Sequence, residues 1–544
     1  MFGSMMKSNL TITSILQHAE LMHPDQEIVS VTSDNPNHRY TYSDAFKRVR
    51  KLANVLSKLG MKQGDRVATL AWNDYRHFEI YYGASCSGFI CHTINPRLFP
   101  EQVDYIINHA EDRLIFVDPV FVPLLEQLEG KLSCVDGIVV LTSMENMPET
   151  KLKKVMCYEN LLANEVDVFD WPELEEGLAS SLCYTSGTTG NPKGVLYSHR
   201  STVMHTYASL LPEAIPLTKE DVILPIVPMF HVNAWALPYS ACVMGAKLVF
   251  PGAKMADGEA LSTLINNEKV TVSAGVPTVW RALLDYLGNT DTTIPSLSRV
   301  VTGGSACPWS IMEEFEEVHD VYTHQAWGMT ETSPLGTFNS RVPDMLSPAE
   351  ARKLRLNQGK PIWGVELRIV NDDGHELPRD GVAFGALQIR GPWVCERYFK
   401  QEESALTEDG WFDTGDVATL DPNGYMTITD RTKDVIKSGG EWISSIELEN
   451  YAMTLDGVAE AAVIGVTHLR WQERPLLIVV PYEGVELNKD NLLLAFKGKV
   501  ADWWVPEDCV FVEDIPHTAT GKVSKKDLRE RFKEYRFPSD SGAQ

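Results

Sequence analysis

Residues 184–194 combine hydroxyl groups, glycines and a lysine in a spacing that could hold phosphate. They follow an apolar run, residues 178–183, that predicts the end of a strand. Glycine lets backbone N–H groups turn toward an anion, and hydroxyl groups and lysine add donors and charge. The predicted phosphate cradle consists of Thr185, Ser186, Gly187, Thr188, Thr189, Gly190 and Lys193. By composition alone, a solvated turn with a surface lysine explains the segment equally well.

The cradle differs from the Walker P-loop. That motif has glycine directly before its lysine and Ser or Thr directly after it. Here Pro192 precedes Lys193, and Gly194 follows it. The residues themselves therefore disfavour a P-loop kinase or GTPase.

Three further segments follow predicted strands and carry polar or aromatic side chains. They supply His231 and Trp235; Gly303, Gly304, Ser305 and Ala306; and Trp327, Gly328, Thr330 and Glu331. Ligands of α/β sheets collect beyond the carboxyl ends of strands, so the strand ends at Thr185, His231 and Gly303 could face one site. Trp327 could flank a base or an acyl chain, and Glu331 could hold Mg²⁺. Any one of these segments alone would more often be core packing or a surface turn.

Composition limits the class of protein. The chain has 544 residues and a formal charge of −25, which disfavours nucleic acid and anionic membrane as partners. Its nine cysteines lack CxxC spacing, as is typical of reduced thiols in a cytoplasmic protein without disulfides or zinc. No signal peptide and no apolar run long enough to span a membrane are evident.

Alternating strands and helices predict a layered α/β fold with a largely parallel sheet. From about residue 360 to 425, short alternating segments between Gly, Pro and Asp turns predict a small β-barrel or sheet. It carries Asp416, whose carboxylate could accept hydrogen bonds from ribose. We place a domain boundary after residue 430, giving an N-terminal domain, 1–430, and a small mobile α+β domain, 431–544. Lys522 lies in a glycine turn of the second domain.

Seven stretches occur in the order found in one family: YTSGTTGNPKG, PMFHVNAW, VTGGSACP, AWGMTE, GWFDTGD, DRTKDVIKSGGEWIS and TATGK. Over almost its whole length the chain resembles the adenylate-forming superfamily of acyl-CoA synthetases, luciferases and adenylation domains. Within it, the chain resembles the fatty-acyl-CoA ligases. The resemblance implies Mg·ATP-dependent formation of acyl-AMP from a carboxylic acid, then acyl transfer to coenzyme A with release of AMP. It also implies a homodimer.

The resemblance assigns roles residue by residue. Thr185–Gly190 and Lys193 would hold the β- and γ-phosphates, while Thr330 and Glu331 would serve the α-phosphate and Mg²⁺, with Thr185 also near the metal. Gly304, Ser305, Ala306, Trp327 and Gly328 would line the adenine slot, and Asp416 and Arg431 would bind ribose. Lys522 would bridge the substrate carboxylate and the α-phosphate during adenylation. His231 would gate the thiol or orient the acyl-AMP carbonyl.

The family also implies domain alternation. Rotation about Lys433 would remove Lys522 and present the coenzyme A-binding segment Lys437, Ser438, Gly439, Gly440, Glu441 and Trp442. The acyl pocket would be lined by His231, Trp235, Gly303, Trp327 and Gly328. Acetate-specific members have tryptophan where Gly328 stands, so Gly328 would leave the pocket open while Trp235 shortens it.

These features predict a short-to-medium-chain apolar acid as substrate, and the resemblance implies 3-(methylthio)propionate as a candidate. A medium- or long-chain fatty acid is the alternative substrate. An adenylating enzyme with another acceptor, such as a carrier protein or oxygen, and a non-catalytic nucleotide-binding protein are the alternative classes. Glu331 and Lys522 argue against the non-catalytic one.

Overall fold

The computed structural model describes residues 1, 3–185, 191–343, 345–438, 441–517 and 523–538. They form two compact units. The first comprises residues 1–366 and 390–412, and the second comprises 367–389 and 413–544. The chain thus leaves the second unit at residue 390 and returns to it at residue 413. The domain boundary after residue 430 stays a prediction.

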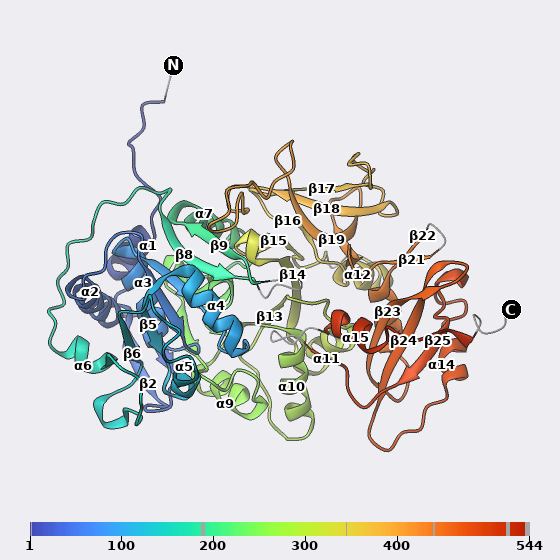
Figure 1. The fold of residues 1–544 in the computed structure, drawn as a ribbon, viewed down its shortest axis with the longest axis horizontal. Coiled ribbons are helices and arrows are strands. Elements are labelled where there is room, and N and C mark those ends of the chain that lie inside the picture. The colour runs from blue at the N-terminus through green and yellow to red at the C-terminus, as the bar shows by residue number, and fades with distance from the viewer. Residues whose placement is uncertain (2, 186–190, 344, 439–440, 518–522, 539–544) are drawn as a thin grey trace. The chain divides into compact units, whose positions relative to one another are not determined.

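Two sheets form the first unit (Figure 1). The seven-stranded sheet has the order β7 (Val155–Cys157), β6 (Gly137–Val140), β5 (Asp112–Val117), β3 (Arg66–Leu70), β4 (Ile90–Thr93), β8 (Ala179–Tyr184) and β9 (Gly194–Ser198). Its neighbours run parallel except β8 and β9, which form an antiparallel hairpin.

The nine-stranded sheet has the order β16 (Lys360–Pro361), β15 (Leu335–Phe338), β14 (Tyr322–Gly328), β13 (Arg299–Thr302), β12 (Val272–Gly275), β10 (Val222–Pro225), β11 (Lys247–Phe250), β1 (Glu27–Ser30) and β2 (His38–Thr41). From β14 to β1 every neighbouring pair is parallel. The predicted layered α/β fold is confirmed in this unit.

Helices connect and cover these strands. They are α1 (Ile12–Met22), α2 (Tyr42–Lys58), α3 (Tyr75–Cys86), α4 (Pro100–Ala110), α5 (Val122–Gln127), α6 (Tyr158–Ala163), α7 (His199–Ser209), α8 (Leu237–Met244), α9 (Gly258–Glu268), α10 (Pro277–Gly288), α11 (Trp309–His319) and α12 (Pro348–Arg355). Short 3₁₀ turns are η1 (Pro119–Phe121), η2 (Met144–Asn146), η3 (Val232–Ala236) and η4 (Thr330–Thr332). Among the described residues, no helix is long and apolar enough to cross a membrane.

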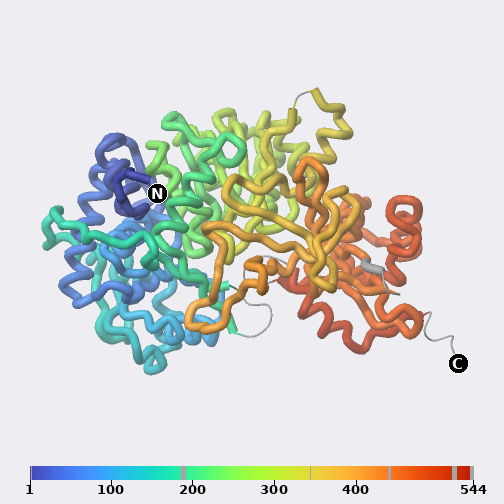
Figure 2. Tube along the Cα trace, turned by 90° about the horizontal axis from the view of Figure 1, so that it is seen from above, coloured from blue at the N-terminus to red at the C-terminus, as the bar shows by residue number. Residues whose placement is uncertain are grey.

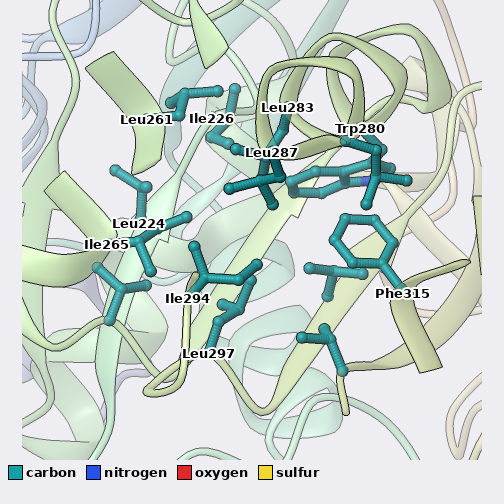
Figure 3. Close-up of a cluster of buried hydrophobic side chains, with 14 of the residues drawn as sticks. Leu224, Ile226, Leu261, Ile265, Trp280, Leu283, Leu287, Ile294, Leu297 and Phe315 are labelled. Atoms are coloured by element: carbon teal, nitrogen blue, oxygen red, sulfur yellow. The ribbon is translucent and has the colours of Figure 1, made fainter. Parts of the chain in front are cut away.

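An apolar core supports the strands that lead to the candidate site. Helices α9, α10 and α11 pack buried side chains against β10 and its neighbours (Figure 3). At its centre, the rings of Trp280 and Phe315 meet edge to face with centroids 5.9 Å apart. Burying such aromatic side chains contributes roughly 1.5–3 kcal/mol each, so this core holds the carboxyl ends of the strands in fixed positions.

The second unit contains two smaller sheets. Strands β17 (Glu366–Val370), β18 (Phe384–Arg390), β19 (Phe412–Leu420) and β20 (Met426–Arg431) form a four-stranded sheet where a small barrel or sheet was predicted. The other sheet has the order β22 (Glu441–Ile443), β21 (Ile436–Ser438), β24 (Gln472–Pro481) and β23 (Val458–His468), with β25 (Asp508–Phe511) paired to β24. Helices α13 (Ser445–Ala452), α14 (Lys489–Ala495) and α15 (Lys525–Arg531), and the turn η5 (Asp502–Trp504), complete the unit.

A buried charge network holds α2, α3 and α6 of the first unit together. Arg76 donates to Asp34 and to Glu159, both at 2.8 Å. Arg48 donates to Glu79 at 2.7 Å and also contacts Glu159. Although burial by itself raises the pKa of the Asp34 carboxyl, hydrogen bonds from Arg76 and neighbouring hydroxyl and amide groups lower it to about 2. Folding therefore favours the ionised form of Asp34.

Replacing Asp34 should therefore destabilise the fold in a pH-dependent way. Because the pKa falls on folding from 3.8 to about 2, the stabilisation is complete above pH 4 and disappears as the pH drops toward 2. We expect Asp34→Asn to lower the free energy of unfolding by about 2 kcal/mol at pH 7. Urea unfolding at several pH values measures this. Asp136→Asn, at a more exposed pair with Arg113, is the control and should change stability by less than about 1 kcal/mol. An equal loss for Asp34→Asn at pH 7 and pH 2.5 would contradict the assignment.

Candidate active site

Parallel pairing brings three of the predicted segments to one edge of the nine-stranded sheet. Pro225 at the end of β10 aligns with Ala274 of β12, and Thr302 at the end of β13 aligns with Gly275 and with Gln325 of β14. The segments carrying His231, Gly303 and Glu331 follow these strands. They therefore leave the sheet at the same edge. Of the three strand ends predicted to face one site, those before His231 and Gly303 share this edge, whereas Thr185 follows β8 of the seven-stranded sheet.

The predicted phosphate loop, called the phosphate loop below, is the connection of the β8–β9 hairpin. At its neck, Thr185 N–H donates to the Lys193 carbonyl at 2.9 Å, and Lys193 N–H approaches the Thr185 hydroxyl at 3.4 Å. Tyr184 and Gly194 pair directly below. These hydrogen bonds therefore hold Thr185 opposite the backbone of Lys193. Ser186, Gly187, Thr188, Thr189 and Gly190 lie outside the described residues.

The segment after His231 has a left-handed backbone. Val232, Asn233, Ala234, Trp235 and Ala236 all have positive φ values, between 46° and 62°. None is glycine, and left-handed backbone costs roughly 1–2 kcal/mol per residue. Such strain persists only where the surroundings impose it.

Asn233 provides part of that constraint. Its side-chain amide donates to the Ser181 hydroxyl at 3.0 Å, and its oxygen accepts from the Cys183 thiol at 3.6 Å. Burial raises the pKa of Cys183 to about 11, so the thiol keeps its proton and can donate. Ser181 and Cys183 belong to β8, the strand that leads into the phosphate loop. Asn233, which the sequence analysis did not single out, thus connects the predicted acyl pocket to the phosphate hairpin.

Trp235 lies across Gly303. A Cβ atom at position 303 would stand 2.9 Å from the indole of Trp235 and 3.0 Å from the carbonyl oxygen of Ala326. Only glycine therefore admits this packing. The two residues predicted to share a pocket wall are brought together. Gly304 follows with φ of +83°, and Ser305 and Ala306 are exposed.

Gly328 is required by a close backbone approach. A Cβ atom there would stand 1.9 Å from the carbonyl oxygen of Pro334, which also accepts a hydrogen bond from Met329 N–H at 3.2 Å. The backbone pairing of β14 and β15 shifts register between Trp327 and Gly328, and Trp327 itself is largely buried. These contacts explain a glycine at 328 without an acyl group, so the open acyl pocket stays a prediction.

Thr330 and Glu331 lie in η4, next to β9 and the 390–412 segment. The Tyr197 hydroxyl donates to the Thr330 carbonyl at 2.6 Å, and the Tyr398 hydroxyl donates to Glu331 Oε1 at 2.8 Å. The Lys193 ammonium lies 4.6 Å from the centroid of the Tyr398 ring. Lys193 and Glu331, 138 positions apart in sequence, thus contact one tyrosine. Sequence reasoning missed Tyr197 and Tyr398, which stand in no motif that it recognised.

Two of the residues predicted to lie near Mg²⁺ carry the oxygen donors that magnesium prefers. Glu331 supplies a carboxylate that is 7% exposed, and Thr185 supplies a hydroxyl. No group of three or more His, Cys, Asp or Glu side chains that could hold a metal occurs in the described part of the chain. A donor set this sparse fits Mg²⁺, which completes its shell with nucleotide phosphates and water.

The second unit carries the predicted ribose and coenzyme A residues. Arg431 Nε donates to Asp416 Oδ1 at 2.8 Å across paired strands β19 and β20. Lys437 N–H donates to Glu473 at 2.9 Å, and Ser438 accepts from Arg474 at 3.3 Å.

Five predicted residues of this unit are described little or not at all. Glu441 and Trp442 form part of β22. Gly439, Gly440 and Lys522 lie outside the described residues. Lys433 is exposed, and partial burial together with nearby cations lowers its pKa.

A buried ionic cluster anchors the helix that begins three residues after Lys522. Lys525 Nζ contacts Glu449 at 2.8 Å, and Ser445 donates to Asp430 from both its N–H and its hydroxyl at 2.6 Å. Although burial by itself lowers the pKa of Lys525, the Glu449 and Asp430 carboxylates raise it, so this lysine keeps its charge. The cluster joins β20, α13 and α15 within the second unit.

Sequence comparisons decide the family. The model of the AMP-binding enzyme family matches residues 16–399, and that of the AMP-binding enzyme C-terminal domain matches residues 447–522. The chain belongs to the AMP-binding enzyme family. The 3-methylmercaptopropionyl-CoA ligase of Ruegeria pomeroyi is 50% identical over 536 residues, covering 98% of this chain and 99% of that protein. The medium-chain-fatty-acid–CoA ligase of Ectopseudomonas oleovorans is 48% identical over 543 residues, covering 99% of each.

Solved structures of the family share the fold. ATP-bound MatB from Rhodopseudomonas palustris has a TM-score of 0.84 at 24% identity, covering 97% of this chain and 99% of that one. The anthranilate CoA ligase AuaEII with anthranoyl-AMP has a TM-score of 0.85 at 23% identity, covering 98% and 99%. The predicted class, an ATP-dependent AMP-forming acid–thiol ligase that uses coenzyme A, is confirmed for this AMP-binding enzyme.

A substitution at Gly328 can show whether glycine is needed there for the close approach of the Pro334 carbonyl or for an open acyl pocket. If the Pro334 carbonyl requires glycine, Gly328→Ala should lower stability by roughly 1–3 kcal/mol and reduce kcat/KM about equally for all acids. Thermal unfolding and an acid series measure both effects. Gly177→Ala is the control, because a Cβ atom there meets nothing within 4 Å. A stable Gly328→Ala enzyme whose preference moves to shorter acids would instead place Gly328 in the acyl pocket.

Proposed function

We propose that this ligase activates a short-to-medium-chain apolar carboxylic acid, with 3-(methylthio)propionate as the candidate substrate. The observation that carries the proposal is the Trp235 indole packed across Gly303, which we interpret as an apolar wall that shortens the acyl pocket. The names of the relatives at 48–50% identity, one for a methylmercapto-acid and one for medium-chain fatty acids, support the same range. A long-chain acid is the second candidate, since a 45% identical relative from Thermus thermophilus is named a long-chain-fatty-acid–CoA ligase.

In the first half-reaction, a carboxylate oxygen of the acid attacks the α-phosphorus of ATP, and the bond to the β-phosphate breaks. Both reactants are anionic, so positive charge and oriented donors must offset their repulsion. Thr185, Lys193 and residues 186–190 hold the leaving phosphates, and Lys522 bridges the carboxylate and the α-phosphate. Mg²⁺, held by Glu331 with Thr185 and Thr330 nearby, would neutralise phosphate charge. Trp327 and residues 304–306 take the adenine, and Asp416 and Arg431 the ribose.

In the second half-reaction, the coenzyme A sulfur attacks the acyl carbonyl and AMP leaves. We propose that rotation about Lys433 withdraws Lys522 and presents residues 437–442 to the thiol. His231 orients the carbonyl or gates the thiol, whose proton can pass to solvent. One site then performs two reactions in turn. We further propose that the enzyme works in the cytoplasm, as its cysteine pattern suggests, and as a homodimer, as the family resemblance implies.

A series of acids tests the substrate. We expect kcat/KM for coenzyme A-dependent AMP formation to peak between about three and twelve carbons, because each methylene matched to the pocket contributes about 1–3 kcal/mol. Pentanoate is the matched control for 3-(methylthio)propionate, since it replaces sulfur by a methylene. We expect the thioether to react at least as well, because sulfur contacts aromatic rings favourably. An optimum at acetate or beyond about twelve carbons would refute the proposal.

The half-reactions test Lys522. Lys522→Ala should slow acyl-AMP formation by about 10²–10³, because it removes positive charge where two anions meet. Thioester formation from supplied acyl-AMP should be largely retained. Pyrophosphate release and acyl-CoA formation measure the two steps separately. Lys526→Ala, at a nearby exposed lysine, is the control. Equal losses in both half-reactions would contradict the assigned role.

A further inference from the structure

Residues 395–399, here named the 395–399 clamp, join the two segments that carry Lys193 and Glu331. Cys395 N–H donates to the Glu331 carbonyl at 2.7 Å, and Phe399 N–H donates to the Gly194 carbonyl at 2.8 Å. In Figure 2 the orange trace of this region passes beside the blue-green hairpin of β8 and β9. Five residues thus connect the η4 turn to the neck of the phosphate loop through the backbone alone.

Apolar packing fixes the Phe399 end of the clamp. Phe399 packs on the cluster of Ile90, Ala110 and Leu182, and its Cβ would be 3.1 Å from a Cβ at Gly194. Gly194 therefore lets the clamp lie close against β9. This contact fixes the distance between the backbone of the clamp and that of β9.

The side chain of Tyr398 also connects the segments that carry Lys193 and Glu331. Its hydroxyl donates to Glu331 Oε1 at 2.8 Å, while its ring lies 4.6 Å from the Lys193 ammonium. One residue holds an anion by its hydroxyl and a cation by its ring.

We propose that Tyr398 is a positioning residue that presents the Glu331 carboxylate and the Lys193 ammonium to Mg·ATP in a fixed arrangement. The inference rests on the proposed function of these two residues. The phenol occupies Oε1 and fixes the carboxylate plane while leaving its negative charge intact. The ring holds the ammonium without neutralising it, because a cation–π contact supplies no counter-ion. A carboxylate in the place of this ring would pair with Lys193 and compete with phosphate.

Two substitutions separate the hydroxyl from the ring. Tyr398→Phe keeps the ring contact with Lys193 and removes the hydrogen bond to Glu331. Tyr398→Leu removes both. Tyr207→Phe, at an exposed tyrosine on α7, is the control. Calorimetric titration measures binding of ATP with and without Mg²⁺, and acid-dependent ATP–pyrophosphate exchange measures the Mg²⁺ concentration dependence.

We expect Tyr398→Phe to bind Mg·ATP about three- to tenfold more weakly, because a hydrogen bond to a charged group is lost, and to need correspondingly more Mg²⁺. Its binding of magnesium-free ATP, its KM for the acid and its melting temperature should match the wild type. Tyr398→Leu should also weaken magnesium-free ATP binding about two- to fivefold through Lys193.

Two outcomes would overturn the inference. One is a Tyr398→Phe enzyme with wild-type Mg·ATP binding and Mg²⁺ dependence. The other is a uniform loss of kcat that follows a lowered melting temperature, which indicates a purely structural role. If the wild type instead shows no exchange with any acid, the proposed function fails, and the ATP titrations still decide the role of Tyr398.

Discussion

The parallel pairing of β10, β12, β13 and β14 is the constraint on which the candidate site depends. Parallel strands place all their carboxyl ends at one edge, and each connecting segment must begin there. The ends of β10 and β13, each paired with β12, put the segments with His231 and Gly303 at one edge of the sheet, although some seventy residues separate them. The aromatic core of α9, α10 and α11 keeps that edge in place. Strand order thus determines which segments lie at the candidate site.

The left-handed turn after His231 shows what the site requires beyond this edge. Five successive residues adopt backbone angles that only glycine takes easily, yet none is glycine. The turn aims Trp235 at Gly303 and Asn233 at β8 in the other sheet. The free energy held in this turn is offset by buried hydrogen bonds and indole packing. The predicted acyl wall and the phosphate hairpin therefore share one strained element.

Two charged residues of the candidate site contact one tyrosine. A chain of net charge −25 must hold a triphosphate and a carboxylate together. Near the phosphate loop, Tyr398 meets Lys193 with its ring and Glu331 with its hydroxyl, while the clamp fixes the backbones behind them. In the second unit, by contrast, Lys525 forms an ion pair with Glu449, and this pair anchors helix α15.

The sequence by itself determined the fold class, the enzyme class and most of the candidate residues. Alternating strands and helices indicate the α/β layers, because each element buries one apolar face with its own period. Glycine, hydroxyl and lysine in residues 184–194 suit phosphate binding but by composition fit a solvated turn equally well. The order of seven motifs along the chain favoured phosphate binding.

Only the tertiary structure revealed which other residues hold the candidate residues in place. Tyr398, Tyr197 and Asn233 act across more than fifty positions of sequence, and no local spacing marks such contacts. The same holds for Gly328, where the sequence suggested an open pocket and the structure shows the Pro334 carbonyl where a Cβ atom would stand. The space left by a glycine's missing side chain can be filled by a ligand or by another part of the backbone. The distinction rests on what the fold brings near it.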